Sequence, residues 1–366
     1  MTIERVTVKF FDVPTETVER DGTLTWSSTG LVTVEIEADG HTGLGYTYAD
    51  LTTAEFVTAH AIPILMGESE KNNLLLIEKI KHEGRNLGYG SVFSMALSAV
   101  DTALWDLKAR QFDISIQELL GVKRGPVTFY GSGLFINNSE EDLIRQIEKF
   151  HSYGVHSFKM KIGEGIERDI ERVVKVQSLL PEGSELFVDA NAAYSPKEAL
   201  ALARALNELN VTYFEEPINS FDVSGMEFLK ERFPDKVNLV AGEYCYLLSD
   251  VMNLLKNEAV DILQVDATRC EGTTGSLMAS HLARAFHVPL STHCAPLLHG
   301  NIGPCMDNFR IGELFYDHLR IEEHYFYFDG KYSAGKFEPS KKQKGFGWKL
   351  NTTHREHLIY EHFAHT

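Results

Sequence analysis

The sequence has little of what marks several large classes of protein. Its four cysteines form no CxxC pair in a chain of 366 residues, so we expect reduced thiols and a cytoplasmic location. No apolar run approaches the roughly 18–20 residues of a membrane span, and the charged start MTIERVTVKFFDVPTE lacks the apolar segment of a signal peptide. Basic residues are few: 35 Lys and Arg stand against 52 Asp and Glu, a net charge of −17, which argues against nucleic-acid binding.

Three motifs with well-understood chemistry are also missing. No GxGxxG follows the first strand of the later βα units, and the stretches GEGIERD and EGTTGS lack the GK[ST] of a phosphate-binding loop. No GxSxG is present, and Ser91 in GYGS lacks that context. These absences disfavour an open doubly wound sheet, a P-loop nucleotide hydrolase and a serine hydrolase of the α/β type.

The first third of the chain has the pattern of a mixed α+β domain. Residues 6–13 and 31–48 alternate apolar and polar side chains, with a turn at Asp39-Gly40, and a polar loop is expected between them at residues 15–30. Helical periodicity then runs through residues 53–66, 72–84 and 94–112. We therefore predict an N-terminal α+β domain over residues 1–125.

From residue 126 onward, short apolar segments alternate with amphipathic helices. Seven strands are clear, from VTFYGSG at 127–133 to VPLSTHC at 288–294, and NFRIGEL at 308–314 is the eighth. Such alternation indicates βαβ units and a parallel sheet, so residues 126–320 predict an α/β fold of the (β/α)₈ TIM-barrel type. An open doubly wound sheet is the alternative. Residues 321–366 are expected to return and complete the N-terminal domain as a cap on the barrel.

The stretch FKMKIG at 158–163 places Lys159 and Lys161 on the same face of a predicted strand. Two neighbouring ammonium groups repel each other, so water or nearby anions must stabilise them. On an exposed edge strand the two lysines would protect against unwanted strand pairing. Whether the pair has a functional role depends on the rest of the chain.

Three acidic residues end three consecutive predicted strands: Asp189 ends LFVD, Glu215 ends TYFE and Glu243 ends LVAGE. The intervals of 26 residues (189 to 215) and 28 residues (215 to 243) each correspond to one βα unit. Active sites of these barrels lie at the C-terminal ends of the strands, so we expect the three carboxylates to meet there. Their mutual repulsion requires a cation, and an all-oxygen set suits Mg²⁺.

Two candidate bases occupy other strand ends. Lys161 precedes Asp189 by 28 residues, which places it one strand earlier at the same mouth. Burial and Lys159 would lower the pKa of its amine, whereas the carboxylates would raise it. His293 follows Asp266 by 27 residues, so neighbouring strand ends would let that carboxylate orient the imidazole.

A substrate carbon held between Lys161 and His293 would have a base on each side. Cys294 follows His293 directly and could suggest a nucleophile. Because adjacent residues of a strand point to opposite faces, we expect the Cys294 side chain to face away from the histidine.

Taken together, these residues resemble the enolase superfamily, in its mandelate racemase-like branch. The similarity covers nearly the whole chain, including the helix SAVDTALWDLKAR ahead of the barrel and the closing GFGW. The matching motifs are KxK at Lys159–Lys161, DAN at Asp189–Asn191, EEP at Glu215–Pro217, AGE ending at Glu243, the Asp266/His293 pair and Glu313 in NFRIGE.

The resemblance implies specific roles for the acidic and basic residues. Mg²⁺ would be held by Asp189, Glu215 and Glu243, with Glu215 rather than Glu216 as the ligand. Lys161 would be one base, tuned by Lys159. His293 with Asp266 would be the second acid or base.

The resemblance also implies residues that bind the substrate. Glu313 would hydrogen-bond the substrate carboxylate, and Asn191 would assist near the metal. Loops of the N-terminal domain would select the substrate through Thr25, Trp26 and Tyr48. The pattern leaves open whether Tyr46, His299 and His318 line the mouth or are structural residues.

The implied chemistry is removal of a proton α to a carboxylate through an enediolate, which concentrated positive charge stabilises. We favour dehydration of an acid sugar (an aldonate or aldarate) to a 2-keto-3-deoxy acid. Racemisation or epimerisation of an α-hydroxy acid or a related carboxylate is the alternative. The partner is thus a small-molecule carboxylate, with no nucleic acid and no membrane, and the resemblance implies a homo-oligomer.

Two other classes are consistent with parts of the pattern. A barrel glycosidase could use Glu215 and Glu243 as its acid pair, but it would not need the lysines and would remain active in EDTA. A non-catalytic scaffold would bind no Mg²⁺ and would be indifferent to changes at Lys161 or His293.

Overall fold

Eight parallel strands close into a barrel in the computed structural model, which describes residues 2–366. The last barrel strand pairs in parallel with the first, which closes the ring. In chain order the strands are β4 (Phe129–Gly133), β5 (Ser157–Lys161), β6 (Glu185–Asp189), β7 (Tyr213–Glu215), β8 (Asn238–Ala241), β9 (Ile262–Val265), β10 (Leu290–Thr292) and β11 (Phe309–Phe315). The closed barrel confirms the predicted fold class, and the alternative of an open doubly wound sheet is wrong.

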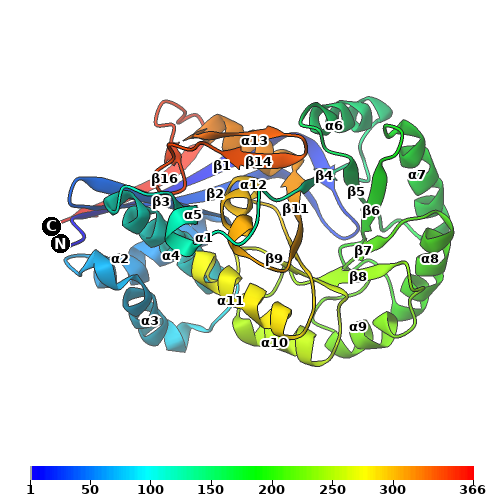
Figure 1. Cartoon of the computed structure of the whole chain (residues 1–366), viewed down its shortest axis with the longest axis horizontal. Helices are drawn as coiled ribbons and strands as arrows, with labels where there is room; N and C mark the ends of the chain where they lie inside the picture. Colours follow the sequence, from blue (N-terminus) through cyan, green and yellow to red (C-terminus); the bar gives the residue numbers. More distant parts are fainter. Residues whose placement is uncertain (1) are drawn as a thin grey trace.

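Each barrel strand leads into a helix on the outside of the barrel (Figure 1). Ser139 and Ser195 begin two of these helices with capping boxes, in which the serine hydroxyl accepts from the backbone N–H three residues later. The outer helices are α6 (Glu140–Ser152), α7 (Ile166–Leu179), α8 (Pro196–Glu208), α9 (Val223–Lys230), α10 (Leu248–Lys256), α11 (Gly272–Ala285), α12 (Pro296–Ile302) and α13 (Tyr316–Tyr325), with a short 3₁₀ turn η4 (Gly303–Cys305) after α12.

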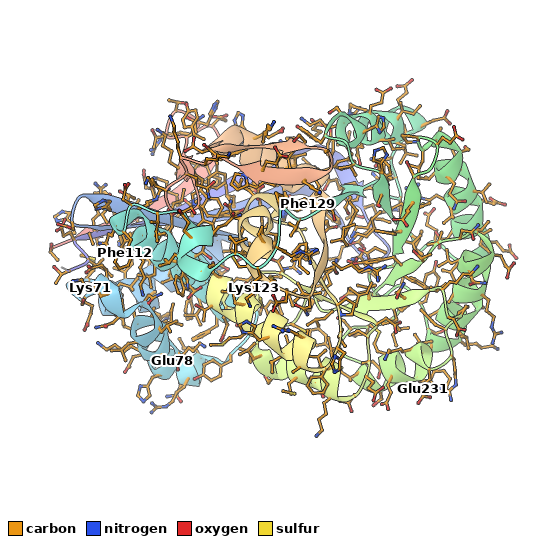
Figure 2. All side chains as sticks on the ribbon, in the orientation of Figure 1. Lys71, Glu78, Phe112, Lys123, Phe129 and Glu231 are labelled. Atoms are coloured by element: carbon orange, nitrogen blue, oxygen red, sulfur yellow. The ribbon has the colours of Figure 1, made fainter. Side chains whose placement is uncertain are left out.

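Side chains from the strands fill the inside of the barrel, and Figure 2 shows all side chains of the described chain on the ribbon. In that view Phe129 marks the start of the first barrel strand and Glu231 lies just past α9 on the outer ring. Deep inside, the rings of Phe187 and Tyr213 stack with their centroids 4.7 Å apart, and Tyr130 packs against both. This aromatic layer forms a floor below the polar residues at the C-terminal ends of the strands.

A four-stranded antiparallel sheet forms the core of the cap, in the order β16-β1-β2-β3. Its strands are β1 (Arg5–Arg20), β2 (Thr25–Ala38), β3 (His41–Tyr48) and β16 (Leu358–His365). The helical part consists of α1 (Leu51–Phe56), the π-helical turn η1 (Val57–Ala61), α2 (Ile62–Leu65), η2 (Glu70–Asn72), α3 (Asn73–Gly84), η3 (Arg85–Leu87), α4 (Val92–Gln111) and α5 (Ile116–Leu120). Within residues 2–366, no helix combines the length and the apolar character needed to cross a bilayer.

The cap is joined to the barrel through α4. Its Trp105 Nε1 donates to Thr274 Oγ1 on α11 at 2.8 Å, and Asp101 accepts from the backbone N–H and the hydroxyl of the same threonine. Burial raises the pKa of Asp101 to about 7. The helix is mostly buried, because it packs against β3 and β2 of the cap as well as against α11.

The C-terminal segment returns to the cap. Its short strands are β12 (Phe326–Phe328), β13 (Gly330–Ser333), β14 (Lys336–Pro339) and β15 (Trp348–Leu350), and β16 then pairs with β1. Trp348 Nε1 donates to the Leu44 carbonyl, and Asp106 accepts from the backbone N–H groups of Leu44 and Phe346. The residues at which the domains divide, near 125 and 320, stay a prediction.

The prediction of a polar loop at residues 15–30 is wrong. Most of it is strand: β1 and β2 form one long hairpin in which Glu19 pairs with Trp26 and Arg20 with Thr25. The hairpin tip lies against the barrel mouth, where a Cβ on Gly22 would come within 2.4 Å of the Ala190 carbonyl oxygen and 2.7 Å of that of Ile162. Backbone pairing across the hairpin therefore outweighs the polar composition of this segment, and the cap reaches directly over the strand ends.

Candidate active site

Three carboxylates meet at the C-terminal ends of neighbouring barrel strands. Asp189 ends β6, Glu215 ends β7 and Glu243 follows β8 by two residues. One carboxylate oxygen from each lies within 4.8 Å of the others, and the three residues are 0–3% exposed. Glu216, the neighbour of Glu215, has a left-handed φ of 37° and is not part of this cluster.

Two buried lysines neutralise part of this negative charge. Lys161 Nζ donates to Asp189 Oδ2 at 2.6 Å, and Lys159 Nζ donates to Glu215 Oε2 at 2.6 Å and lies 2.9 Å from Glu313 Oε1. Burying charges in this way is tolerable only because each one faces an opposite charge. The exposed edge strand considered for the two lysines is therefore wrong.

The arrangement leaves room for a divalent cation. Glu215 Oε1 and Glu243 Oε2 are buried oxygens that find no hydrogen-bond donor anywhere in residues 2–366, and the same holds for the side-chain oxygen of Asn191. Unpartnered buried carboxylate oxygens are costly, and an all-oxygen set of this kind suits a hard ion such as Mg²⁺. The residues present thus fit a magnesium site.

The charges in the cluster set opposite pKa directions for its members. Burial and the neighbouring Asp189 raise the pKa of Glu215 well above its usual range. Burial alone would raise the pKa of Asp189, but the adjacent Lys161 and Lys159 lower it. For Lys161, burial favours the neutral amine, yet the Asp189 carboxylate outweighs it and raises the pKa. A cation bound to Asp189 would weaken that contact and favour the neutral amine.

On the other side of the mouth, His293 and Asp266 form a hydrogen-bonded pair. His293 Nδ1 lies 2.8 Å from Asp266 Oδ2, and Asp266 Oδ1 accepts from the backbone N–H and the hydroxyl of Thr268, both at 2.7 Å. Burial would raise the pKa of Asp266, but its bond to His293 holds that pKa below the usual range. The imidazole therefore turns Nε2 toward the carboxylate cluster, where it lies 3.4 Å from Glu243 Oε2.

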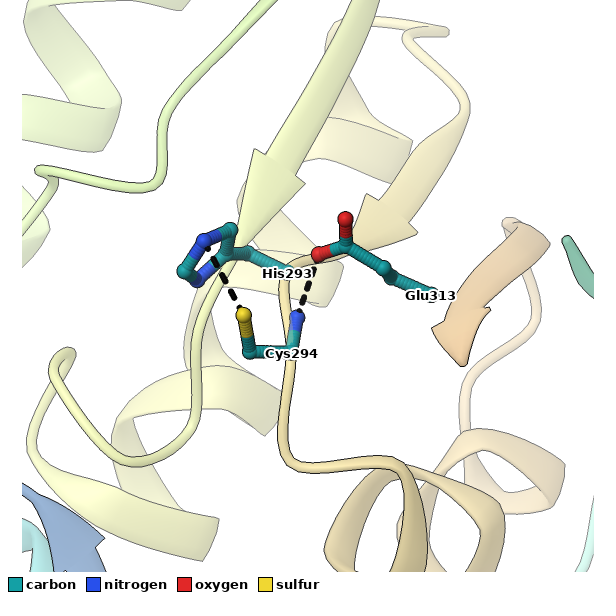
Figure 3. Close-up of side chains that lie close together, drawn as sticks. All are labelled: His293, Cys294 and Glu313. Atoms are coloured by element: carbon teal, nitrogen blue, oxygen red, sulfur yellow. Dashed lines mark hydrogen bonds between the residues drawn. The ribbon is translucent and has the colours of Figure 1, made fainter. Parts of the chain in front are cut away.

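Cys294 does not face away from His293 as expected. Its Sγ lies 3.2 Å from His293 Nε2, and its backbone N–H donates to Glu313 Oε2 at 2.7 Å (Figure 3). The strand ends at Thr292, and Cys294 has a left-handed φ of 50°, so strand alternation no longer applies at this position. Burial raises the pKa of the Cys294 thiol well above its usual range, which argues against a thiolate nucleophile.

Glu313 joins the two sides of the site. One of its oxygens lies against Lys159 and the other accepts from the Cys294 backbone, and the residue is 1% exposed. Both oxygens are therefore already engaged by the protein. Its predicted bond to a substrate carboxylate stays a prediction.

The predicted substrate-binding residues differ in where they lie. A cleft of about 430 Å³ opens above the cluster, and Trp26, Tyr48 and Asn191 line it together with Lys161 and His293. Trp26 Nε1 donates to Glu19 and its ring packs edge-on against Phe135.

Thr25 is exposed and outside the cleft lining, because neighbouring residues of β2 face opposite sides and Trp26 takes the inner one. The predicted contact of Thr25 with a substrate stays a prediction. Tyr46 is fully buried, with its hydroxyl donating to Glu322 at 2.6 Å, so it is a core residue.

In the cleft lining, Arg269 was not identified from the sequence, and His318 was named there only as one of two alternatives. Arg269 contacts both Glu243 and Asp266, at 3.2 and 3.6 Å, and its only sequence signal is its position three residues after Asp266. His318 from α13 stacks on Tyr48 at 3.3 Å and lines the cleft, whereas His299 is structural and accepts from the Ala267 backbone. Burial holds the pKa of His318 well below its usual range.

Comparisons with known proteins agree with this geometry. Residues 5–121 match the mandelate racemase / muconate lactonizing enzyme N-terminal domain, and residues 142–354 match the family described as enolase C-terminal domain-like. The L-talarate/galactarate dehydratase of Salmonella typhimurium is 26% identical over 83% of this chain and 79% of its own. The arabinonate dehydratase of Saccharolobus solfataricus is 30% identical over 72% of each chain. A hydrophobic dipeptide epimerase of Roseobacter litoralis is 29% identical over 80% of this chain and 82% of its own.

Solved structures give the same result. A mandelate racemase/muconate lactonizing enzyme-like protein from Rubrobacter xylanophilus superposes with a TM-score of 0.94 at 35% identity, covering 98% of this chain and 100% of the other. The L-talarate dehydratase from Polaromonas sp. JS666, complexed with Mg and L-glucarate, has a TM-score of 0.89 at 26% identity and covers 100% and 99%. With both family domains matched and the carboxylate cluster in place, the chain belongs to the enolase superfamily, in its mandelate racemase/muconate lactonizing enzyme branch.

Proposed function

We propose that the protein dehydrates an acid sugar, an aldonate or aldarate, to a 2-keto-3-deoxy acid. The observation that carries the proposal is the arrangement of two potential bases at opposite ends of one carboxylate cluster. Lys161 contacts Asp189 on one side, and the Asp266-bound His293 approaches Glu243 on the other. The acid-sugar dehydratases among the relatives support this choice of substrate.

Asp189, Glu215 and Glu243 would hold Mg²⁺, because their buried oxygens converge and two of them lack a hydrogen-bond donor within residues 2–366. When bound, the ion would supply positive charge that stabilises the negative charge growing on the substrate carboxylate. Lys159 supports the same site from below, since it is 0% exposed and holds Glu215 and Glu313 in place. It cannot itself reach a substrate.

The chain's own residues would move two protons. Lys161 as a neutral amine, or His293 at Nε2, takes the proton from the α-carbon as the C–H bond breaks. His293 in its imidazolium form then gives a proton to the β-hydroxyl, which leaves as water as the C–O bond breaks. Asp266 stabilises that imidazolium through Nδ1. The resulting enol takes up a proton at the β-carbon and becomes the 2-keto-3-deoxy acid.

The geometry argues against a glycosidase. Glu215 is 0% exposed, and its Oε2 accepts from Lys159 and from Gln264 at 3.0 Å. A carboxylate held in this way cannot approach a glycosidic bond as a nucleophile or an acid. The intact set of bases and acids likewise argues against a non-catalytic scaffold.

A panel of acid sugars tests the proposal. Each sugar is incubated with the enzyme and Mg²⁺, and the keto acid is detected as its semicarbazone. We expect turnover of at least one aldonate or aldarate, its loss in EDTA, and its loss in Lys161→Ala and His293→Asn. His287→Asn is the matched control, because His287 is exposed on the outer ring with a φ of 59° that asparagine accepts readily. If no acid sugar in a complete stereochemical panel gives keto acid, dehydration is wrong.

Epimerisation at the α-carbon is the second candidate, and the same opposed bases favour it, as does the dipeptide epimerase among the relatives. Incubation in D₂O separates the two reactions. Dehydration gives keto acid and loses water, whereas epimerisation places deuterium on the α-carbon and retains every hydroxyl. The assembly into a homo-oligomer stays a prediction.

A further inference from the structure

A second cluster of metal-ligating side chains lies outside the cleft. His324 is in the last turn of α13, and His354 and Glu356 lie in the loop between β15 and β16. One donor atom from each of the three lies within 4.8 Å of the others. The cluster thus brings together two segments that are 30 residues apart in sequence (324 to 354).

Both histidines turn a ring nitrogen toward the same carboxylate. His324 Nε2 is 2.6 Å and His354 Nδ1 is 3.2 Å from the same oxygen, Oε1 of Glu356. The two imidazole rings lie beside each other with their centroids 3.9 Å apart. The side chains are 37–44% exposed, so an ion can reach them from solvent.

The neighbouring arginines do not compete for this carboxylate. Arg355, which lies between the two loop ligands, donates to Glu361 at 2.6 Å. Arg320, one turn before His324, donates to Asp317 at 2.5 Å.

We propose that His324, His354 and Glu356 form a second metal site, which binds a borderline divalent ion such as Zn²⁺ rather than Mg²⁺. Two imidazoles and one carboxylate are a donor set that Zn²⁺ and its neighbours in the transition series prefer, with water completing the coordination. Mg²⁺ strongly prefers oxygen ligands and is retained instead by the all-oxygen cluster in the cleft. The site does not depend on the proposed dehydratase activity.

The site would act as a clamp between the barrel and the cap. His324 belongs to the last barrel helix, and the loop with the other two ligands leads directly into β16, which pairs with β1. Backbone hydrogen bonds already hold the loop at both of its ends. The Asn351 N–H donates to the Tyr325 carbonyl, and the Asp12 N–H donates to the His357 carbonyl. Because the ligands meet only in the folded chain, metal binding stabilises the folded form.

The test uses the full-length protein saturated with Mg²⁺, titrated with Zn²⁺ by isothermal calorimetry and followed by thermal unfolding. We expect one Zn²⁺ equivalent whose affinity falls by about tenfold or more in His324→Gln and in His354→Gln. Zn²⁺ should raise the Tm of the wild type and not that of these variants. His365→Gln is the matched control, since His365 is exposed at the end of β16 and outside the cluster.

The three ligands are partly exposed, so their substitution should leave the core intact, and circular dichroism checks that the variants are folded. Glu356→Gln provides a third variant with the same expected loss of Zn²⁺ affinity. Because the cleft is saturated with Mg²⁺ in every protein of the series, a difference in Zn²⁺ binding between the wild type and the variants reports on this cluster alone. Equal Zn²⁺ affinity in the wild type and the cluster variants would overturn the site. If Zn²⁺ affinity fell in His354→Gln but not in His324→Gln, the metal would not join the barrel to the cap, and the clamp would be overturned.

Discussion

Asp266→Asn tests most sharply how His293 is prepared for proton transfer. Two hydrogen bonds from Thr268 hold Oδ1 of Asp266, and Oδ2 faces His293 Nδ1 at 2.8 Å. In the asparagine variant the amide oxygen keeps the Thr268 donors, so the amide NH₂ must face Nδ1. Nδ1 then has to accept a hydrogen bond, which places the ring proton on Nε2 and removes the lone pair that faces the cleft.

We expect kcat for acid-sugar dehydration to fall about 10³–10⁴-fold, because the wrong tautomer of a catalytic imidazole costs about 10⁴ in a comparable Asp–His pair. This corresponds to roughly 4–5.5 kcal/mol of activation free energy. KM should change little, since Asp266 is 1% exposed and acts through the histidine. Initial rates come from semicarbazone formation, and exchange of the α-proton in D₂O is followed by NMR. Exchange that persists in the variant would identify Lys161 as the base that acts first.

The matched control is Asp261→Asn at the other end of β9, where Asp261 accepts from the Leu239 backbone far from the chemistry. The double variant Asp266→Asn with His293→Asn should be no slower than His293→Asn alone, because the two residues act as a unit. A kcat for Asp266→Asn within about threefold of the wild type would refute the tautomer argument.

Three further predictions follow from other parts of the structure. Burial raises the pKa of Glu322 to about 8 although Tyr46 donates to it, so between its unfolded pKa near 4.5 and about 8 only the folded state keeps the proton. The free energy of unfolding should therefore fall as pH rises through that window. Urea unfolding at pH 5, 6.5 and 8 measures this change. The free energy of unfolding should depend less on pH in Glu322→Gln than in the wild type, whereas Glu323→Gln should keep the wild-type dependence. Gly22→Ala should lower kcat/KM roughly tenfold with little change in Tm, because a Cβ at this position displaces the hairpin tip from the mouth. Gly125→Ala is the control, since a Cβ there would meet only open space, and it should leave kcat/KM unchanged in the same kinetic assay. Dialysis against EDTA should abolish turnover and added Mg²⁺ should restore it; activity that survives the chelator would exclude the metal from the reaction.

Most of the candidate site could be predicted from the intervals between strand ends. Because each βα unit adds nearly the same length, residues 26–28 positions apart at strand ends must meet at one rim, and this placed Asp189, Glu215, Glu243 and the Asp266/His293 pair together. Local patterns fail where the chain leaves its regular path. Cys294 turns back toward His293 through a left-handed backbone, and Thr25 is an exposed residue of a strand that was expected to be a loop.

The sequence by itself determined the βα rhythm, the acidic strand ends and the two lysines on one face, since these depend only on the spacing of residues along regular elements. Only the tertiary structure decided that Lys159 is sealed beneath the cluster while Lys161 reaches the cleft, and that Arg269 and His318 belong to the site. It also brought His324 to a loop 30 residues further along the chain. Such contacts join elements whose relative placement follows from packing the whole core, so no local pattern records them.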